Sequence, residues 1–353
     1  MSKPSPVRGL FDPKDPHASF SQLSLMAECE ARYNWEYGKG HESVSRLADI
    51  GRIGHEALAY INLSLLNNEQ GIDRLDIEAA KDMMVRFKDY GHYANFCNWM
   101  ENYAAKANEE KESILAVEFE VKSNLDLGNG RSIEIRGKID RLDKGENFGE
   151  CTITDYKMWG VIPSREELEA EFQMELYNWM MRDPVNSRKF DLNPLRTFKK
   201  RWVSIFHDLT MEAKADLNGA EDAQRYAKEL ILKMIENRKR GNGHYPETFN
   251  RRCTSCGRVK FCKTFIREMG PTGLKLITKP SLPEYVRYKD KLAVVTQIKE
   301  QVGEALKNRI SEYGQPIVEG GFRAELQHHE GGQEVSFVKG PWTALSVKKV
   351  GRK

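Results

Sequence analysis

Three consecutive stretches with strand-like alternation constrain the fold of this chain more than any other feature. They cover residues 114–121, 132–140 and 151–156, and a turn-forming Lys144–Asn147 segment separates the last two. Apolar and polar residues that alternate with a period of two are typical of half-buried strands. The three stretches therefore predict a meander, in which each strand lies beside the next.

Helical periodicity surrounds this meander on both sides. Before it, apolar spacing predicts helices over about residues 21–29, 43–66 and 76–108, the last broken near Gly91. After it, the sequence predicts a helix from Ser164 to Met181, a strand over 201–207 and a helix over 211–238. This order of elements favours an α/β domain with a central mixed sheet flanked by helices.

Composition divides the chain into three parts. Residues 1–20 are rich in Pro, Ser and charge and are expected to form an arm, while residues 21–265 are expected to form the main domain. The GPTG segment at 270–273 marks a boundary, so residues 266–353 are expected to be a basic C-terminal extension of helix and short strands. Its helix should begin after Ser281 and end at Gly314, with an apolar stripe of Leu292, Val295, Val302, Leu306 and Ile310. That helix is open to three roles: pairing with a partner, extending a DNA path, or capping the core.

Charge and hydropathy exclude some classes of protein. The net charge is only +3, so bulk charge does not identify a partner. No run of eighteen apolar residues exists and the N-terminus lacks an apolar signal region, so a cytoplasmic protein is expected. Two segments, 196–201 and 251–263, hold several cations without an acid. They are suited to neutralising phosphates, or they are solvated surface.

Two acidic residues and a lysine stand at the ends of neighbouring predicted strands. Asp140 ends one strand, and Asp155 and Lys157 lie on the next with one residue between them. Side chains at i and i+2 of a strand share a face, so Asp155 and Lys157 project together. Two carboxylates at a sheet end can hold Mg²⁺, and a neighbouring lysine can orient water or neutralise developing charge. The alternative is that these charges form strand-end ion pairs.

The segments GKIDR (137–141) and ITDYK (153–157) resemble the PD-(D/E)XK nuclease superfamily, and in particular its RecB-like branch. The resemblance implies that Asp140 and Asp155 bind a metal and that Tyr156 offers its backbone carbonyl to it. It also implies that Lys157 is catalytic.

Two further segments extend this resemblance. GRIGHEAL (51–58) is similar to the family's upstream helical motif, which implies that His55 is a metal ligand. An imidazole among carboxylates makes Mn²⁺ an alternative to Mg²⁺. Gln173 and Tyr177 fit the family's Q-x-x-x-Y motif, and their spacing of four places them on one helix face, where they could reach the active site or DNA. The alternatives are a structural histidine and a hydrogen bond on the helix surface.

Three of the six cysteines are closely spaced, as Cys253, Cys256 and Cys262. Such thiolates can clamp a metal, with zinc borrowing His244 or an iron–sulfur cluster borrowing Cys29. The pattern resembles the iron–sulfur subset of RecB-like nucleases, which includes CRISPR-associated exonucleases. That resemblance implies a structural [4Fe–4S] cluster held by Cys29, Cys253, Cys256 and Cys262. Cys97 and Cys151 are expected to be buried as small hydrophobes.

The motifs together favour a metal-dependent deoxyribonuclease that uses Mg²⁺ or Mn²⁺. An exonuclease acting on DNA ends or single strands is expected, with a helicase, recombinase or integration complex as a candidate partner. One alternative is a non-catalytic DNA-binding or scaffolding subunit of a recombination or repair complex that keeps the nuclease fold. Another is a zinc-containing binding module.

Overall fold

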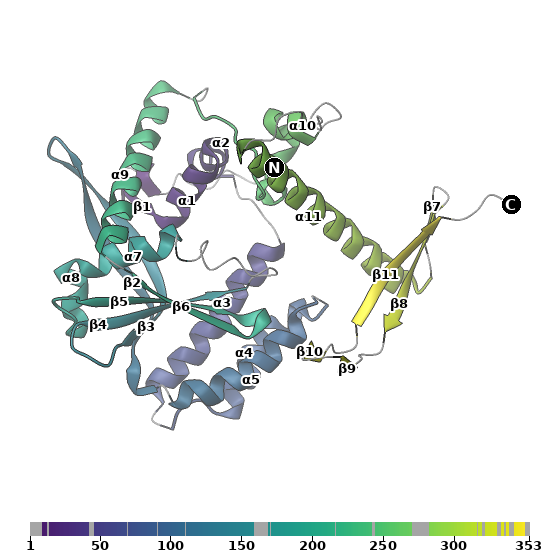
Figure 1. Cartoon of the computed structure of the whole chain (residues 1–353), viewed down its shortest axis with the longest axis horizontal. Helices are drawn as coiled ribbons and strands as arrows, with labels where there is room; N and C mark the ends of the chain where they lie inside the picture. Colours follow the sequence, from purple (N-terminus) through teal and green to yellow (C-terminus); the bar gives the residue numbers. More distant parts are fainter. Residues whose placement is uncertain are drawn as a thin grey trace. The chain divides into compact units, whose positions relative to one another are not determined.

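Two compact units, residues 1–248 and 249–353, divide the chain (Figure 1). The structure is a computed structural model. It describes residues 9–12, 14–41, 46–68, 70–89, 91–109, 111–158, 169, 171–215, 217–241, 244–269, 282–315, 317–319, 322–329, 333–334, 337–338 and 342–349. The boundary expected from sequence after residue 265 lies inside the second unit.

A six-stranded mixed sheet forms the centre of the first unit. Its strands are β1 (His17–Ser19), β2 (Ile114–Gly128), β3 (Arg131–Lys144), β4 (Glu150–Lys157), β5 (Thr197–Ser204) and β6 (Leu209–Ala215). β2, β3 and β4 pair antiparallel in chain order, so the predicted meander is confirmed. β4 then pairs in parallel with β5, which pairs antiparallel with β6. β1, from within the expected N-terminal arm, pairs in parallel with β3.

Helices cover both faces of this sheet, and two apolar clusters fill the space between. One cluster joins the sheet to α1 (Phe20–Glu28), α7 (Phe172–Arg182) and α9 (Leu217–Arg240), through residues such as Leu23, Leu176 and Ile231. The other joins it to α3 (Arg46–Asn67), α4 (Arg74–Met84) and α5 (Tyr93–Glu109), through residues such as Leu58 and Trp99. The expected α/β architecture, a mixed sheet flanked by helices, is therefore confirmed. The short α-helices α2 (Glu30–Tyr33) and α8 (Pro184–Ser187) and several 3-10 and π-helical turns also belong to the described part of this unit.

Two local predictions were wrong. Residues 211–215, expected to start a helix, belong to β6, where side chains alternate between half-buried and exposed along an edge strand. The helix expected from Ser164 to Met181 does not run unbroken, because Glu171 has an extended backbone and α7 begins only at Phe172. The predicted cap at Ser164–Glu167 lies outside the described residues.

The second unit contains the cysteine-rich turns and a long helix. Short 3-10 turns at Cys253–Ser255 and Val259–Phe261 precede α10 (Lys263–Met269) and α11 (Leu282–Tyr313). Strands β7 (Ile317–Glu319), β8 (Phe322–His329) and β11 (Trp342–Lys349) form an antiparallel sheet, and β9 (Gln333–Glu334) pairs with β10 (Phe337–Val338).

The apolar stripe predicted for the helix in the extension was partly wrong. Leu292, Val295 and Val302 are exposed, whereas Val294 and Ile310 are buried in this unit. No helix among the residues that the structure describes is long and apolar enough to cross a membrane.

Candidate active site

Asp140 and Asp155 meet because a tight turn fixes the register of β3 and β4. The turn closes with Gly145 N–H donating to the Glu150 carbonyl over 2.8 Å, and Arg141 then faces Thr154 across the two strands. Asp140 and Asp155 occupy the next pair of facing positions. The backbone N–H of Tyr156 donates to Asp140 Oδ2 over 3.0 Å, which fixes the orientation of that carboxylate.

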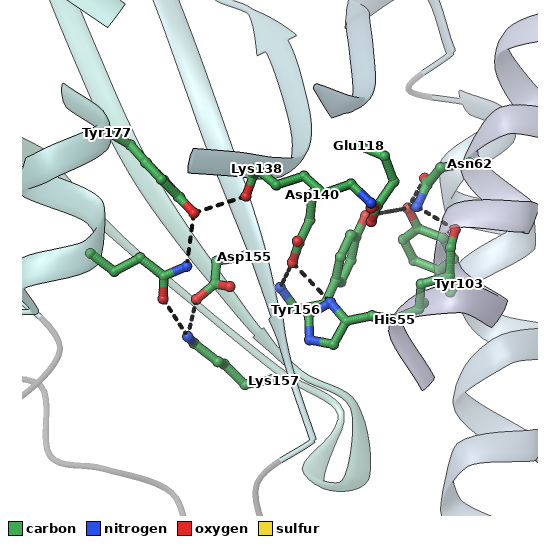
Figure 2. Close-up of polar contacts among 12 residues, drawn as sticks. His55, Asn62, Tyr103, Glu118, Lys138, Asp140, Asp155, Tyr156, Lys157 and Tyr177 are labelled. Atoms are coloured by element: carbon green, nitrogen blue, oxygen red, sulfur yellow. Dashed lines mark hydrogen bonds and ion pairs between the residues drawn. The ribbon is translucent and has the colours of Figure 1, made fainter. Parts of the chain in front are cut away.

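His55 reaches the same carboxylate from helix α3, as Figure 2 shows. Its Nδ1 lies 3.3 Å from Asp140 Oδ2. The neighbouring Gly54 packs against the end of the Met158 side chain, to which an added Cβ would lie at 2.1 Å. Burial opposes protonation of His55, but the hydrogen bond and charge of Asp140, with the charge of Asp155, raise the pKa of the imidazole above its ordinary value.

Asp155 is the most buried acid of the site, with only 5% of its surface exposed. Burial raises its pKa to about 7. The charge of Lys157 lowers that pKa, while Asp140 and Glu171 raise it. A carboxylate with a raised pKa beside other carboxylates is stabilised in its charged form when a cation neutralises it. The electrostatics of this position therefore favour a bound cation.

The Lys157 ammonium lies among oxygen acceptors from β4, α7 and the residue before α7. It forms a short ion pair with Asp155, and its Nζ lies 3.2 Å from Glu171 Oε1 and 3.3 Å from Gln173 Oε1. Burial lowers the pKa of Lys157, but Asp155 and Glu171 outweigh that effect and raise it above the ordinary value. Lys157 is therefore held as a cation.

Gln173 and Tyr177 connect this lysine to the neighbouring strand. Gln173 Nε2 donates to Tyr177 Oη over 3.2 Å, and that hydroxyl donates to the Lys138 carbonyl over 2.8 Å. The ring of Tyr177 packs directly on Gly137, where a Cβ would lie 2.4 Å from Tyr177 Cε1. The glycine of the GKID segment is thus required for the close packing of α7 on β3.

A buried polar network supports the site from the side of the helices. Tyr103 and Tyr156 share a hydroxyl–hydroxyl hydrogen bond, and Asn62 Nδ2 donates to Tyr156 Oη over 3.3 Å. Arg141 Nη1 donates to Tyr103 Oη over 3.0 Å, and its Nε donates to Asp143 Oδ1 over 2.9 Å. These interactions join helices α3 and α5 to the strands that carry Asp140 and Asp155 (Figure 2).

Sequence reasoning missed Glu171, Trp202, Asn62 and Tyr103. None of them belongs to a motif, and each joins the site through contacts between segments distant in the chain. One local feature of the sequence could have indicated Glu171, because this acid lies two residues before Gln173 of the Q-x-x-x-Y motif.

The donor set of His55, Asp140 and Asp155 fits a hard divalent cation, since two carboxylates supply oxygen ligands and negative charge. Among the residues that the structure describes, no three His, Cys, Asp or Glu side chains stand close enough to hold a metal ion. In this structure Asp155 is paired with Lys157. His55 Nδ1 contacts Asp140 Oδ2, and the backbone N–H of Tyr156, the residue after Asp155, donates to the same oxygen.

The four cysteines of the predicted cluster are divided between the units, with Cys29 in the first and the other three in the second. Backbone N–H groups donate to three of the sulfurs. Thr248 N lies 3.4 Å from Cys29 Sγ, Asn250 N 3.3 Å from Cys253 Sγ, and Phe265 N 3.4 Å from Cys262 Sγ. Of the other cysteines, Cys151 is buried and Cys97 is half-buried.

The basic segment 196–201 is not a uniform phosphate-binding surface. Lys200 is only 2% exposed and its Nζ contacts Glu175 Oε1 at 2.5 Å. Arg201 pairs with Glu212 at 2.6 Å. Both cations are thus compensated within the protein.

The mixed sheet and helix α3 thus bring His55 to Asp140 on β3, beside Asp155 and Lys157 on β4. The family model of the PD-(D/E)XK nuclease superfamily matches residues 17–263, more than half of the chain. The chain belongs to this superfamily.

Two solved structures are similar at low identity. The crystal structure of SSO0001 is 11% identical with a TM-score of 0.34, covering 72% of this chain and 86% of that one. The structure of a "Putative exonuclease" from Eubacterium rectale is 11% identical with a TM-score of 0.38, covering 76% and 92%. A comparison with curated proteins gives no match.

Proposed function

We propose that this protein is a metal-dependent deoxyribonuclease that hydrolyses phosphodiester bonds at DNA ends or in single strands. The observation that carries the proposal is the convergence of His55 from α3, Asp140 from β3, and Asp155 and Lys157 from β4. Membership of the nuclease superfamily supports the reaction class.

His55, Asp140, Asp155 and the backbone carbonyl of Tyr156 would hold Mg²⁺ or Mn²⁺. The bound metal would neutralise charge on the phosphate and make water a stronger acid. Lys157, held as a cation, donates a hydrogen bond to a phosphate oxygen whose negative charge grows during attack. Water attacks phosphorus and the ester P–O bond breaks, which leaves one product with a phosphate end and one with a hydroxyl end. Gln173 and Tyr177 keep the lysine at this position.

Digestion of end-labelled single-stranded and double-stranded DNA with Mg²⁺ or Mn²⁺ tests the proposal. The parent protein should shorten the labelled strand, and Asp140→Ala and Lys157→Ala should abolish the reaction while the fold is kept. Lys144→Ala is a control, because this exposed lysine is the last residue of β3 and lies four residues beyond Asp140. DNA binding without cleavage by the parent would instead identify a scaffolding subunit. Undiminished digestion by Lys157→Ala would refute the assignment of the active site.

We further propose that Cys29, Cys253, Cys256 and Cys262 hold a structural [4Fe–4S] cluster. Thiolates accept hydrogen bonds from backbone N–H groups in such sites, and three of these sulfurs have one. Because such ligation contributes free energy of folding, the cluster would stabilise the protein. A colourless protein with stoichiometric zinc would contradict this proposal.

Visible absorption of anaerobically purified protein tests the cluster. The parent should be brown, Cys256→Ser should lose the absorption, and Cys97→Ser should keep it. A helicase, recombinase or integration complex is proposed as the partner that supplies DNA to the site, and co-purification with such an assembly is the corresponding test.

A further inference from the structure

Glu171 lies between the proposed catalytic lysine and the core of the protein. It precedes the first residue of α7 and has an extended backbone, with φ −66° and ψ 115°. One carboxylate oxygen, Oε1, lies 3.2 Å from Lys157 Nζ. The other, Oε2, accepts a short hydrogen bond from the indole N–H of Trp202. The carboxylate thus joins two groups that neighbouring strands position.

Trp202 gives this carboxylate a fixed anchor. Its side chain is only 1% exposed, and it lies on β5 at the position paired with Asp155 on β4. A buried indole N–H requires an acceptor, and its direction is set by a ring that close packing does not allow to turn. Glu171 satisfies this donor, so the carboxylate is held in place and is not a mobile surface group.

The charges of the site show why a third acid is needed. Lys157 now pairs with Asp155 as well as with Glu171. A divalent metal at Asp140 and Asp155 would use the Asp155 oxygens and would repel the ammonium. Two aspartates then balance the dication, and Lys157 keeps Glu171 as its anionic partner and Gln173 as its neutral one.

We propose that Glu171 is a positioning residue for the cleavage reaction. It holds the Lys157 ammonium beside the scissile phosphate once Asp155 is committed to the metal. Trp202 supports it by fixing the carboxylate. This inference rests on the proposed nuclease function and assigns a role in it to a residue outside every recognised motif of the chain.

Steady-state cleavage of end-labelled DNA by Glu171→Gln is the central test, because glutamine keeps the shape and an acceptor for Trp202 but removes the charge. We expect kcat to fall by about 10-fold to 100-fold, as for other residues that support a functional group from behind. KM for DNA and the Mg²⁺ concentration for half-maximal rate should stay within about twofold. Glu171→Asp should restore part of kcat. Glu212→Gln removes an exposed carboxylate on β6, beside the strand that carries Trp202. This variant should behave like the parent.

A double-mutant cycle tests whether Glu171 acts through the lysine. Lys157→Ala should abolish digestion under multiple turnover, but long single-turnover incubations with excess enzyme can detect a residual rate. In this background Glu171→Gln should cause no further loss of the residual rate. An independent, additive loss would overturn the proposal. So would a Glu171→Gln protein whose lost rate returns at high Mg²⁺, since that result identifies a metal ligand.

Thermal unfolding separates this role from a purely structural one. A Glu171→Gln protein with a lowered Tm and an unchanged kcat would overturn the proposal and leave the nuclease assignment intact. A parent protein that cuts no DNA under any metal condition would refute the nuclease function itself. The two failures are therefore distinguishable in one set of assays.

Discussion

The hydroxyl oxygens of Tyr103 and Tyr156 lie 2.5 Å apart between helix α5 and strand β4. Tyr156 is the middle residue of the D-x-K segment, so this hydrogen bond lies directly behind the proposed metal and lysine positions. Arg141, the residue after Asp140, donates to the same Tyr103 oxygen. The helical layer is thus connected by directional contacts to both strands that carry the acids, in addition to apolar packing.

Tyr103→Phe should destabilise the protein by about 2 kcal/mol, because it leaves buried partners in Asn62, Tyr156 and Arg141 without that hydroxyl. Urea denaturation measures this difference. Tyr60→Phe is the control, since Tyr60 is an exposed residue of α3 whose hydroxyl donates to Asp76. Equal denaturation midpoints for Tyr103→Phe and the parent would show that the network contributes little.

Gly137→Ala should lower both stability and DNA cleavage. The added Cβ would lie 2.4 Å from the rigid ring of Tyr177, so α7 must shift and carry Gln173 away from Lys157. A drop in kcat of about tenfold or more is expected for a shift near 1 Å. Gly51→Ala is the matched control, because a Cβ added at that position would have nothing within 4 Å and alanine favours the helix there. Parent-like cleavage by Gly137→Ala would contradict this role of the glycine.

Metal affinity should depend on pH through Asp155. Its pKa in the metal-free protein is raised to about 7, so a metal must displace a proton from it below that pH. His55 acts in the same direction, because its pKa is also raised and only neutral imidazole binds metal. The Mg²⁺ concentration for half-maximal cleavage should therefore rise as pH falls below about 7, by roughly tenfold per unit for one proton, and level off above it. A flat dependence between about pH 5.5 and 8.5 would contradict the burial of Asp155.

Glu175→Gln should destabilise the fold more than most surface charge removals. Lys200 is buried, and its Nζ contacts Glu175 Oε1 at 2.5 Å and the Glu169 carbonyl at 2.9 Å. Loss of the carboxylate removes the counter-charge that the described residues give to this buried ammonium, which costs about 3 kcal/mol. Calorimetric unfolding measures this cost, and the additional change Lys200→Met should recover much of it. If Glu175→Gln alone is as stable as the parent, solvent must reach the Lys200 ammonium.

Local geometry explains which parts of the site could be predicted from sequence. The facing of Asp140 and Asp155 follows from a short turn and strand alternation, and the shared face of Gln173 and Tyr177 follows from their spacing of four. Both relationships span few residues and depend little on the rest of the chain.

Other parts depend on distant packing and could not be predicted. The contact of Glu171 with Trp202 requires the parallel pairing of β4 with β5, and Tyr103 meets Asn62 across 41 residues. Strand β6 was misjudged because Met211, Glu212, Ala213 and Lys214 are good helix formers, and pairing with β5 overrides that preference. In the extension, charge and apolar spacing alone did not identify the buried face of α11.

The parallel pairing of β4 with β5 has an evolutionary consequence. Parallel strands need a crossover connection, and α7 lies in this crossover and brings Gln173 back to Lys157. Lys157 and the residues that contact it therefore belong to one continuous stretch of chain, which begins with β4 and ends with β5. A recombination event that exchanged this stretch would transfer Lys157 together with Glu171, Gln173 and Trp202.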